Sequence, residues 1–227
     1  MSTIVLATQN PGKVAELRSL LQDSSIEILG LSDLSDSFPE PDETGQTFLE
    51  NATIKAQEYA KLTGKHCLAD DSGLMIDAIG GRPGVISSHY AFNGETDGRA
   101  AALSRQQRDE HNIDRVLAEL DGVELEDRSA RFVCVMVLAD PSGEVIATSE
   151  GTFEGRIGFP IDEPNAIPSE TVPRGDHGFG YDPIFLVHPD YLQTSAELEP
   201  AEKNAISHRG AAVRAMIEHI KGLALDS

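Results

Sequence analysis

The chain has 227 residues, which is enough for one large domain or for two closely joined lobes with a sizeable core. Lysine and arginine total 18 against 38 aspartates and glutamates, and the resulting net charge of -20 argues against nucleic acid or an anionic membrane as a partner. Because only 5% of the residues are aromatic, an aliphatic core is expected. Any phosphate site in so acidic a chain must gather its cations locally.

The first predicted elements are a buried strand over residues 3–7 and an amphipathic helix, joined by a turn. Asn10 is a favourable N-cap, and Pro11 suits the first helical position. A helix N-terminus offers unpaired N–H groups and partial positive charge, and here Thr8 adds a hydroxyl and Lys13 a full charge. The turn is therefore a candidate phosphate site, although many such units bind nothing.

A second helix is predicted to begin at Thr47, after an acidic, proline-containing loop over residues 32–46. Thr47 and Glu50 have the spacing of a capping box. Thr47, Asn51 and Lys55 are four residues apart and form one polar stripe on this helix. Lys55 is either a snorkelling side chain or a second ammonium group for a phosphate site.

An acidic turn is predicted where the next strand, residues 66–69, ends in Asp70 and Asp71. Ligands bind at the carboxyl ends of strands in open α/β sheets, and carboxylates there suit Mg²⁺ bound to a substrate phosphate. Adjacent strand residues point to opposite faces, so only one aspartate is expected to face a site directly. Glu43 is a candidate second metal ligand. The alternative is an ordinary turn with aspartate caps.

The middle of the chain predicts two helices, at about residues 97–108 and 112–120, and then a hairpin of strands 131–139 and 145–153 around a turn at 140–143. Strands that alternate with helices and are followed by a hairpin favour an α/β fold with a mixed sheet. The other predicted elements are strands at 26–29 and 179–186, an extended segment at 74–79, a loop at 157–177, and a final helix with Val213, Met216, Ile217, Ile220 and Leu223 on one face.

Cations gather just before the final helix. Ser207 is expected to cap this helix, with His208 and Arg209 in its first turn and Lys203 shortly before it. Cations in a first turn oppose the helix dipole unless an anion or an electron-rich ligand is bound. The segment 178–183 sets two aromatic side chains between glycines, either to stack on a base or as buried aromatics at a strand edge.

Both cysteines, Cys67 and Cys134, lie in apolar, strand-like runs, which indicates buried thiols in a reducing compartment. No C-x-x-C pair occurs, so a zinc ribbon is not expected. The sequence shows no secretory signal, and its longest apolar run, residues 132–139, is too short to span a membrane. A cytoplasmic protein is therefore expected.

Seven motifs follow one another along nearly the whole chain. They are Thr8-Gln9-Asn10-Pro11-Gly12-Lys13, Glu43-Thr44-Gly45, Glu50-Asn51-Ala52 with Lys55-Ala56, Ala69-Asp70-Asp71-Ser72-Gly73-Leu74, Gly81-Arg82-Pro83-Gly84, Gly178-Phe179-Gly180-Tyr181-Asp182-Pro183, and Glu202-Lys203 with Ile206-Ser207-His208-Arg209-Gly210. In this order they closely resemble the inosine triphosphate pyrophosphatase family, whose members act on non-standard purine nucleotides.

The resemblance implies a single α/β domain over residues 1–227 with two lobes, a long mixed sheet flanked by helices, and an active-site cleft between the lobes. The hairpin lobe is expected at roughly residues 129–186. The resemblance also implies a homodimer and Mg²⁺-dependent hydrolysis of ITP, dITP and XTP to the monophosphate and pyrophosphate.

Matching motif positions carry the family's roles onto this chain. Asp71 is expected to be the base for the attacking water and, with Glu43, a metal ligand, while Asp70 and Lys55 support catalysis. Ser72 is expected to contact the substrate. The residues expected to hold the triphosphate are Thr8, Gln9, Asn10, Pro11, Gly12, Lys13 and Lys55. The residues expected to surround the base are Phe179, Gly180, Tyr181, Asp182, Lys203, His208 and Arg209.

Two features depart from the family pattern. Where relatives commonly have Ser-Ala-Arg-Tyr, this chain has Ser87-Ser88-His89-Tyr90, so an imidazole replaces a guanidinium. The loop at 157–177 is also longer than expected for compact bacterial members of the family. It is either a lid over the site or a surface insertion that the fold tolerates, and the insertion is favoured.

Two other functions remain as alternatives. One is a related enzyme that acts on modified pyrimidine or standard nucleotides, against which the Ser-His-Arg and Phe-Gly-Tyr-Asp segments argue. The other is a nucleotide-binding regulator without turnover, which would not need the cluster of acids.

Overall fold

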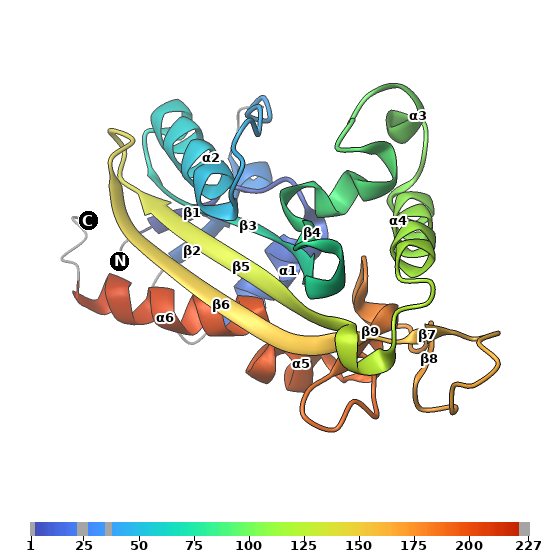
Figure 1. Cartoon of the computed structure of the whole chain (residues 1–227). Helices are drawn as coiled ribbons and strands as arrows, with labels where there is room; N and C mark the ends of the chain where they lie inside the picture. Colours follow the sequence, from blue (N-terminus) through green and yellow to red (C-terminus); the bar gives the residue numbers. More distant parts are fainter. Residues whose placement is uncertain (1–2, 22–26, 35–37, 223–227) are drawn as a thin grey trace. The chain divides into compact units, whose positions relative to one another are not determined.

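The computed structural model describes residues 3–21, 27–34 and 38–222 (Figure 1). The chain divides into two compact units. Unit 1 consists of Met1–Ser72, Cys134–Thr152 and Ser207–Ser227, and unit 2 consists of Gly73–Val133 and Phe153–Ile206. Three long strands contribute residues to both units: β3 (His66–Ile76), β5 (Ser129–Ala139) and β6 (Val145–Ile157). The expected cleft between lobes and the expected extent of the hairpin lobe stay predictions.

The strands follow the order β2-β1-β3-β5-β6-β9, with β4 beside β3. β1 (Thr3–Leu6) is parallel to both β2 (Glu27–Gly30) and β3. β4 (Arg82–Pro83) is antiparallel to β3, and β9 (Phe185–Val187) is antiparallel to β6. The mixed sheet and the α/β class are therefore confirmed.

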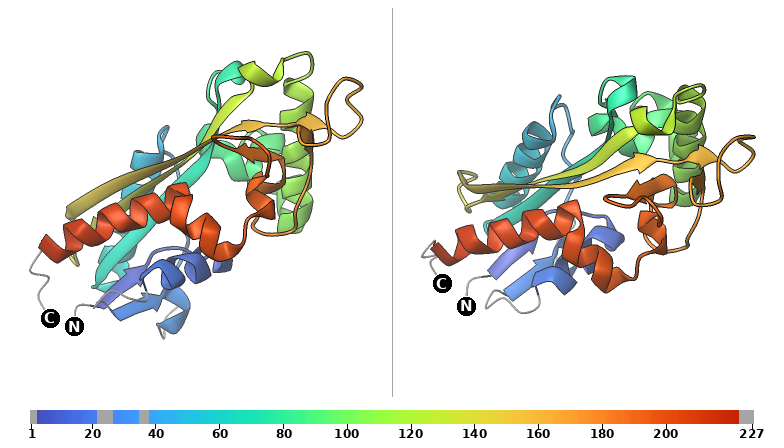
Figure 2. Two further views of the ribbon diagram at one scale, coloured as in Figure 1. Left: turned by 90° about the horizontal axis from the view of Figure 1, so that it is seen from below. Right: turned by 60° about the horizontal axis from the view of Figure 1, so that its bottom comes forward.

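Alternation of side chains along the strands gives unit 1 two apolar faces. Even-numbered residues such as Leu6 and Leu68 pack with α1 (Pro11–Leu21) and α6 (His208–Gly222). Odd-numbered residues such as Cys67 pack with α2 (Phe48–Thr63). Figure 2 shows α6 running beside these strands. In β1, β3 and β5, the apolar residues of unit 1 are thus directed to one of two helical layers by their parity.

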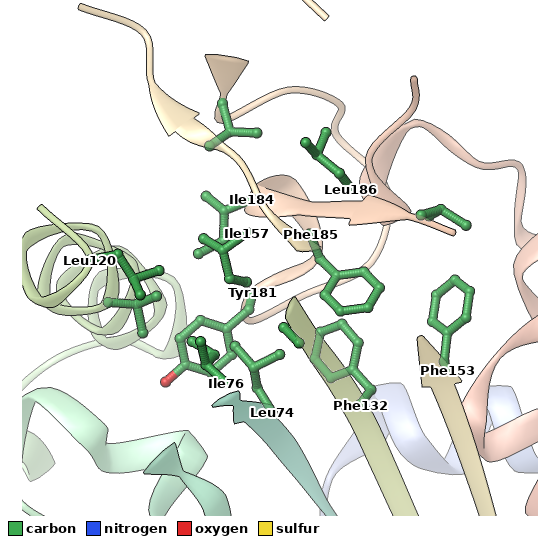
Figure 3. Close-up of a cluster of buried hydrophobic side chains, with 14 of the residues drawn as sticks. Leu74, Ile76, Leu120, Phe132, Phe153, Ile157, Tyr181, Ile184, Phe185 and Leu186 are labelled. Atoms are coloured by element: carbon green, nitrogen blue, oxygen red, sulfur yellow. The ribbon is translucent and has the colours of Figure 1, made fainter. Parts of the chain in front are cut away.

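Unit 2 has a core of its own in which aromatic rings are prominent (Figure 3). The ring of Phe185 lies 4.6 Å from that of Phe132 and 5.3 Å from that of Phe153, measured between centroids. Leu74 and Ile76 continue the even-numbered positions of β3 into this cluster. Most of the buried residues in this cluster are aliphatic, as expected, but the cluster also gathers several of the chain's few aromatic residues.

Local sequence signals correctly predict the start of α1, both ends of α2 and the start of α6. The Asn10 side chain accepts a hydrogen bond from the Gly12 N–H at 3.0 Å, which caps α1. Thr47 and Glu50 form the expected capping box, and Gly64 ends α2 with a φ of 63°. Ser207 accepts a hydrogen bond from the Gly210 N–H at 3.1 Å at the start of α6.

The acidic segment is not the turn that the sequence predicts. β3 runs without interruption from His66 to Ile76, so Asp70 and Asp71 lie inside a strand. β1 accompanies β3 only as far as Leu68. The two aspartates therefore lie just after the residues where β1 and β3 pair. Pairing with strands that are distant in the sequence keeps this segment extended, although its local residues favour a turn.

Two further predictions need correction. The expected break between residues 108 and 112 is absent, because Ser104 caps a helix, α4 (Arg105–Glu119), that continues through it. Only the short helix α3 (Gly98–Ala101) precedes this cap. The strand expected at 179–186 is reduced to β9, because residues 182–184 form a 3-10 turn that begins with Asp182 and Pro183.

The segment expected to be extended at 74–79 is a strand only as far as Ile76, because residues 77–79 form a 3-10 turn that ends at Gly80. The other predicted elements agree with the sequence pattern. The hairpin is confirmed, with strands longer than predicted, and the loop at 157–177 contains one small parallel pair. The strand predicted at 26–29 is β2, while Ile26 and Leu223 lie outside the described residues. The elements not yet given are β7 (Phe159–Pro160), β8 (Thr171–Val172) and α5 (Pro200–Ile206).

Both cysteines are buried and free, as predicted. Within the described ranges, none of the helices has the length and apolar character needed to cross a bilayer.

A buried guanidinium anchors the start of the 157–177 loop. Arg128 is 2% exposed and donates hydrogen bonds to the carbonyls of Leu120 at 2.8 Å, Val123 at 2.9 Å and Gly158 at 2.9 Å. Its guanidinium also lies 4.3 Å from the centre of the Phe159 ring. These contacts join the end of α4 to the first residues of the loop.

Replacing Arg128 with methionine is expected to lower the free energy of unfolding by about 3 kcal/mol, because three buried carbonyls lose their donor. Arg131→Met is the matched control, since Arg131 forms exposed ion pairs with Asp77 and Glu154 and should cost less than about 1 kcal/mol. Urea denaturation measures both variants, and equal losses would contradict the anchoring role of Arg128.

Candidate active site

The polar stripe of α2 organises one cluster of charged groups in unit 1. Asn51 accepts a hydrogen bond from the Gly45 N–H at 2.8 Å and donates one to the Asp71 carboxylate at 3.3 Å. The Lys55 ammonium lies 3.1 Å from Asp71 Oδ1 and 3.3 Å from Glu43 Oε2. Asn51 and Lys55 thus connect the loop that carries Glu43 to the strand that carries Asp71.

A glycine is required where this loop meets α2. A side chain at position 45 would place its Cβ 2.6 Å from Asn51 Oδ1, which is closer than such atoms approach each other. The absence of a side chain at Gly45 therefore lets the loop come within hydrogen-bonding distance of Asn51. This approach joins the segment Glu43-Thr44-Gly45 to the helix motif that contains Asn51.

Burial and charge act differently on the two partners in this cluster. Burial raises the pKa of Asp71, and the nearby Lys55 ammonium only partly offsets that effect. Burial lowers the pKa of Lys55, but Asp71 and Glu43 raise it by more, so its pKa lies above the usual value. Asp71 is consequently a stronger base than an ordinary carboxylate, while Lys55 stays a cation.

The opposite face of β3 holds a second cluster, which is centred on Asp70. The Lys13 ammonium lies 2.9 Å from Asp70 Oδ2, and Arg209 Nε lies 3.6 Å from the same oxygen. Ser72 donates to Asp70 at 3.4 Å and accepts a hydrogen bond from Arg209 at 3.0 Å. This face therefore brings together the first turns of α1 and α6 around one buried carboxylate.

The two neighbouring aspartates differ in pKa because their surroundings differ. Burial favours the neutral acid at Asp70, but Lys13, Arg209 and Lys55 together hold the pKa of Asp70 well below its ordinary value. Asp70 is thus a fixed anion. Asp70 and Asp71 thus lie on opposite faces of β3, and that only one of them faces the ligand stays a prediction.

The turn before α1 is fixed by its own side chains. Thr8 accepts a hydrogen bond from the Asn10 N–H at 3.2 Å, and the Asn10 side chain accepts from Gly12 and Lys13 N–H groups at 3.0 and 3.4 Å. Gln9 donates to the Phe38 carbonyl at 3.2 Å. The residues predicted to hold a triphosphate, Thr8 to Lys13, therefore lie at the N-terminus of α1, with Lys13 directed at Asp70.

The carboxylates of the α2 cluster suit a magnesium ion. Asp71 and Glu43 supply hard oxygen atoms, and both carboxylates lie within 3.3 Å of the same Lys55 ammonium. Among the residues that the structure describes, no three His, Cys, Asp or Glu side chains gather as a metal site. Two carboxylates fit Mg²⁺ nonetheless, because this ion usually keeps several waters and binds substrate phosphates.

Unit 2 holds a separate polar cluster around Asp182, which is buried. This carboxylate accepts hydrogen bonds from the Phe179 N–H at 2.8 Å and the Ser195 hydroxyl at 2.8 Å, and it pairs with the Lys203 ammonium at 2.5 Å. The same ammonium lies 5.6 Å from the centre of the Phe179 ring. Phe179, Asp182 and Lys203, all predicted to surround the base, are therefore brought together.

The structure separates the predicted site residues into two groups. Unit 1 holds those assigned to phosphate and metal, together with His208 and Arg209, and unit 2 holds Phe179 to Asp182 and Lys203. The sequence reasoning missed the contacts of Asn51, although the α2 stripe contained the signal. It also missed Ser195, the hydroxyl partner of Asp182, for which no local motif gave a signal.

The histidine that departs from the family pattern lies in unit 2. The Nδ1 atom of His89 is 2.9 Å from the Ser88 hydroxyl. Burial and the nearby Arg108 lower the pKa of His89, so this imidazole is less readily protonated than an ordinary histidine. It therefore does not reproduce the permanent charge of the arginine that relatives commonly have there.

Comparisons with known proteins find similar sequences and structures over nearly the whole chain. The sequence model of the Ham1 family matches residues 4–219. The dITP/XTP pyrophosphatase of Bacillus licheniformis is 44% identical over 94% of this chain and 95% of its own length. That of Shouchella clausii is 45% identical over 98% of each chain. A HAM1 protein from Coxiella burnetii has a similar structure, with a TM-score of 0.78 and 41% identity, covering 98% of this chain and 100% of its own.

The depressed pKa of Asp70 makes a prediction about stability and pH. Asp70→Asn is expected to lower the free energy of unfolding at pH 7 by about 3 kcal/mol, because Lys13 and Arg209 lose their buried partner. A carboxyl group whose folded-state pKa lies below the unfolded value, about 3.9, stabilises the fold above that value and loses this effect as the pH falls. The difference between wild type and variant should therefore shrink below about pH 4.

Urea denaturation at pH 7, 5 and 3 measures this difference, with Asp77→Asn as the control for an exposed ion pair. A difference that is the same at pH 3 and pH 7 would show that the charge of Asp70 is not what stabilises this cluster.

Proposed function

Because the chain belongs to the Ham1 family, as the match over residues 4–219 shows, we propose that it hydrolyses ITP, dITP and XTP to the monophosphate and pyrophosphate. Two relatives that align over nearly the full length are named dITP/XTP pyrophosphatases. The observation that carries the proposal is the cluster of Asp71, Lys55 and Glu43, in which a carboxylate of raised pKa lies beside an ammonium and a second carboxylate.

Asp71 has the properties of a general base. A carboxylate with a raised pKa accepts a proton more readily than an ordinary one. We assign it the proton of a water molecule that attacks the α-phosphorus, where a new P–O bond forms as the bond to the departing pyrophosphate breaks. The Asn51 and Lys55 hydrogen bonds hold the carboxylate in place for this step. Asp71 and Glu43 would also hold Mg²⁺, which supplies positive charge to the departing pyrophosphate.

Lys13 and the N-terminus of α1 are assigned to the triphosphate. A lysine ammonium has three N–H donors, so Lys13 can keep its contact with Asp70 and still donate to a phosphate oxygen. Because Asp70 stays charged, it fixes the position of this ammonium before substrate arrives. Phosphoryl transfer depends mainly on such positioning and on electrostatic stabilisation.

The purine base is assigned to Phe179 for stacking and to Lys203 as a donor, both in unit 2. Inosine and xanthosine present an acceptor oxygen at C6, whereas adenine presents an amino donor. A donor of the protein that meets the adenine amino group stays unpaired, which can discriminate strongly between the bases. Guanine also carries the C6 oxygen, so its rejection must depend on the 2-amino group.

We also propose that the enzyme requires Mg²⁺, forms a homodimer and acts in the cytoplasm. The two free, buried cysteines support a reducing compartment. The resemblance of the motifs supports the dimer and the metal.

The proposed function predicts a substrate order. Pyrophosphate release with Mg²⁺, measured across ITP, dITP, XTP, GTP, ATP and dUTP, should give the first three the highest kcat/KM, by about 10²-fold or more over ATP. Equal activity on all six nucleotides would keep the pyrophosphatase chemistry but contradict the assigned recognition of the C6 oxygen. No release from any of them would favour a binding protein without turnover.

The role of Asp71 predicts a loss of turnover without an equal loss of binding. Asp71→Asn should lower kcat on ITP by about 10²-fold or more, since the amide cannot accept the proton, while the Kd for ITP changes far less. Glu58→Gln, at an exposed position of α2, is the matched control and should leave both constants unchanged. If turnover and affinity of the Asp71 variant both equal those of wild type, the assigned role is wrong.

A further inference from the structure

Helix α4 contacts the turn that contains Phe179 and Gly180. Asp109 Oδ2 accepts a hydrogen bond from the Gly180 N–H at 3.0 Å. One turn earlier on the same helix, the Arg105 guanidinium lies 4.6 Å from the centre of the Phe179 ring. Arg105 and Asp109 are also 3.9 Å apart as an i, i+4 ion pair. One face of α4 therefore reaches both the backbone and the ring of this turn.

The same turn is held from its other side by Asp182, which accepts the Phe179 N–H at 2.8 Å. Consecutive N–H groups, those of Phe179 and Gly180, are thus bonded to two different carboxylates. Gly178 and Gly180 have φ values of 80° and 62°, in the left-handed region that glycine adopts freely. Because glycine has many other conformations available, the turn depends on these outside contacts to keep one shape.

The position of the Phe179 ring follows from the backbone of this turn. The ring is half-buried and is contacted by two cations, Arg105 at 4.6 Å and Lys203 at 5.6 Å. A stacking surface for a base must be held at a fixed angle, since a small rotation loses much of the overlap between two rings. The contacts of Arg105 and Asp109 restrict such a rotation.

We propose that Asp109 and Arg105 are positioning residues for purine recognition, which hold the turn at residues 178–182 so that Phe179 presents its ring to the base. This inference rests on the proposed function and adds to it the helix that prepares the base site. Neither residue touches the reacting phosphate in this assignment. Their loss should therefore weaken the capture of substrate more than the chemical step.

The same helix also fixes the segment that carries His89. Asn112 accepts a hydrogen bond from the Ala91 N–H at 2.8 Å and donates to the Ser88 carbonyl at 3.1 Å. The Tyr181 hydroxyl donates to the Ser87 carbonyl at 2.8 Å. The turn and the His89 segment are therefore bonded to each other and to α4, which makes this helix a common support for both.

The test compares Asp109→Ala, Asp109→Asn and the control Asp114→Ala, which removes an exposed carboxylate from the same helix. Asp109→Ala should raise the KM for ITP about five- to tenfold with kcat within about threefold, as expected for the loss of one charge-assisted hydrogen bond. Asp109→Asn should have a KM close to that of wild type, because the amide oxygen still accepts a hydrogen bond from the Gly180 N–H. The control should match wild type.

Hydrogen–deuterium exchange of the same proteins supplies a readout that does not depend on turnover. Peptides that contain Phe179 and Gly180 should exchange faster in Asp109→Ala, but not in Asp109→Asn or the control. Faster exchange with an unchanged KM would overturn the positioning role, as would unchanged exchange. A kcat that falls as far as KM rises would also overturn it.

These outcomes are distinct from a failure of the proposed function. If the wild-type enzyme releases no pyrophosphate from ITP, the proposed function is wrong, and the inference about α4 is wrong with it. If wild type is active but Asp109→Ala has the same KM, only the inference about α4 fails.

Discussion

The alternation of side chains along β3 is the constraint on which the charged groups of unit 1 depend. Asp70 and Asp71 are neighbours in sequence, but the pleat of the strand directs them to opposite helical layers. Asp70 meets Lys13 and Arg209, and Asp71 meets Asn51 and Lys55. As a result, one carboxylate has its pKa lowered and stays a fixed anion, whereas the other has its pKa raised and can accept a proton. A shift of one residue in this strand would exchange these roles.

Local signals were sufficient wherever a few adjacent residues decide the structure. The caps at Asn10 and Thr47 and the hairpin turn are of this kind, because their hydrogen bonds close within a few residues. The continuation of β3 through Asp70 could not be predicted in this way, because it depends on strands far away in the sequence. The sequence pattern also predicted a break between residues 108 and 112. In the structure, the helix that Ser104 caps continues through these residues.

The site could be predicted to the extent that its residues lie in motifs. Lys55 and Asp71 were each identified from a short pattern, and the structure brings them to 3.1 Å from each other. Asp109 could not be found in this way. It is one acid among several on a highly charged helix, and its partner is the backbone of Gly180, 71 residues away. A contact between a side chain and a distant main-chain group leaves no mark on the local sequence of either partner.

The cations in the first turn of α6 illustrate how an unfavourable local pattern is resolved. The sequence suggested that Arg209 opposes the helix dipole unless an anion is bound, and the structure supplies that anion within the chain, as Asp70. Lys13, in the first turn of α1, is neutralised by the same carboxylate. An acidic protein thereby holds a buried guanidinium and a partly buried ammonium around one carboxylate of its own. A triphosphate that reaches these cations must share them with Asp70, and this sharing is possible because both side chains have more N–H donors than one carboxylate uses.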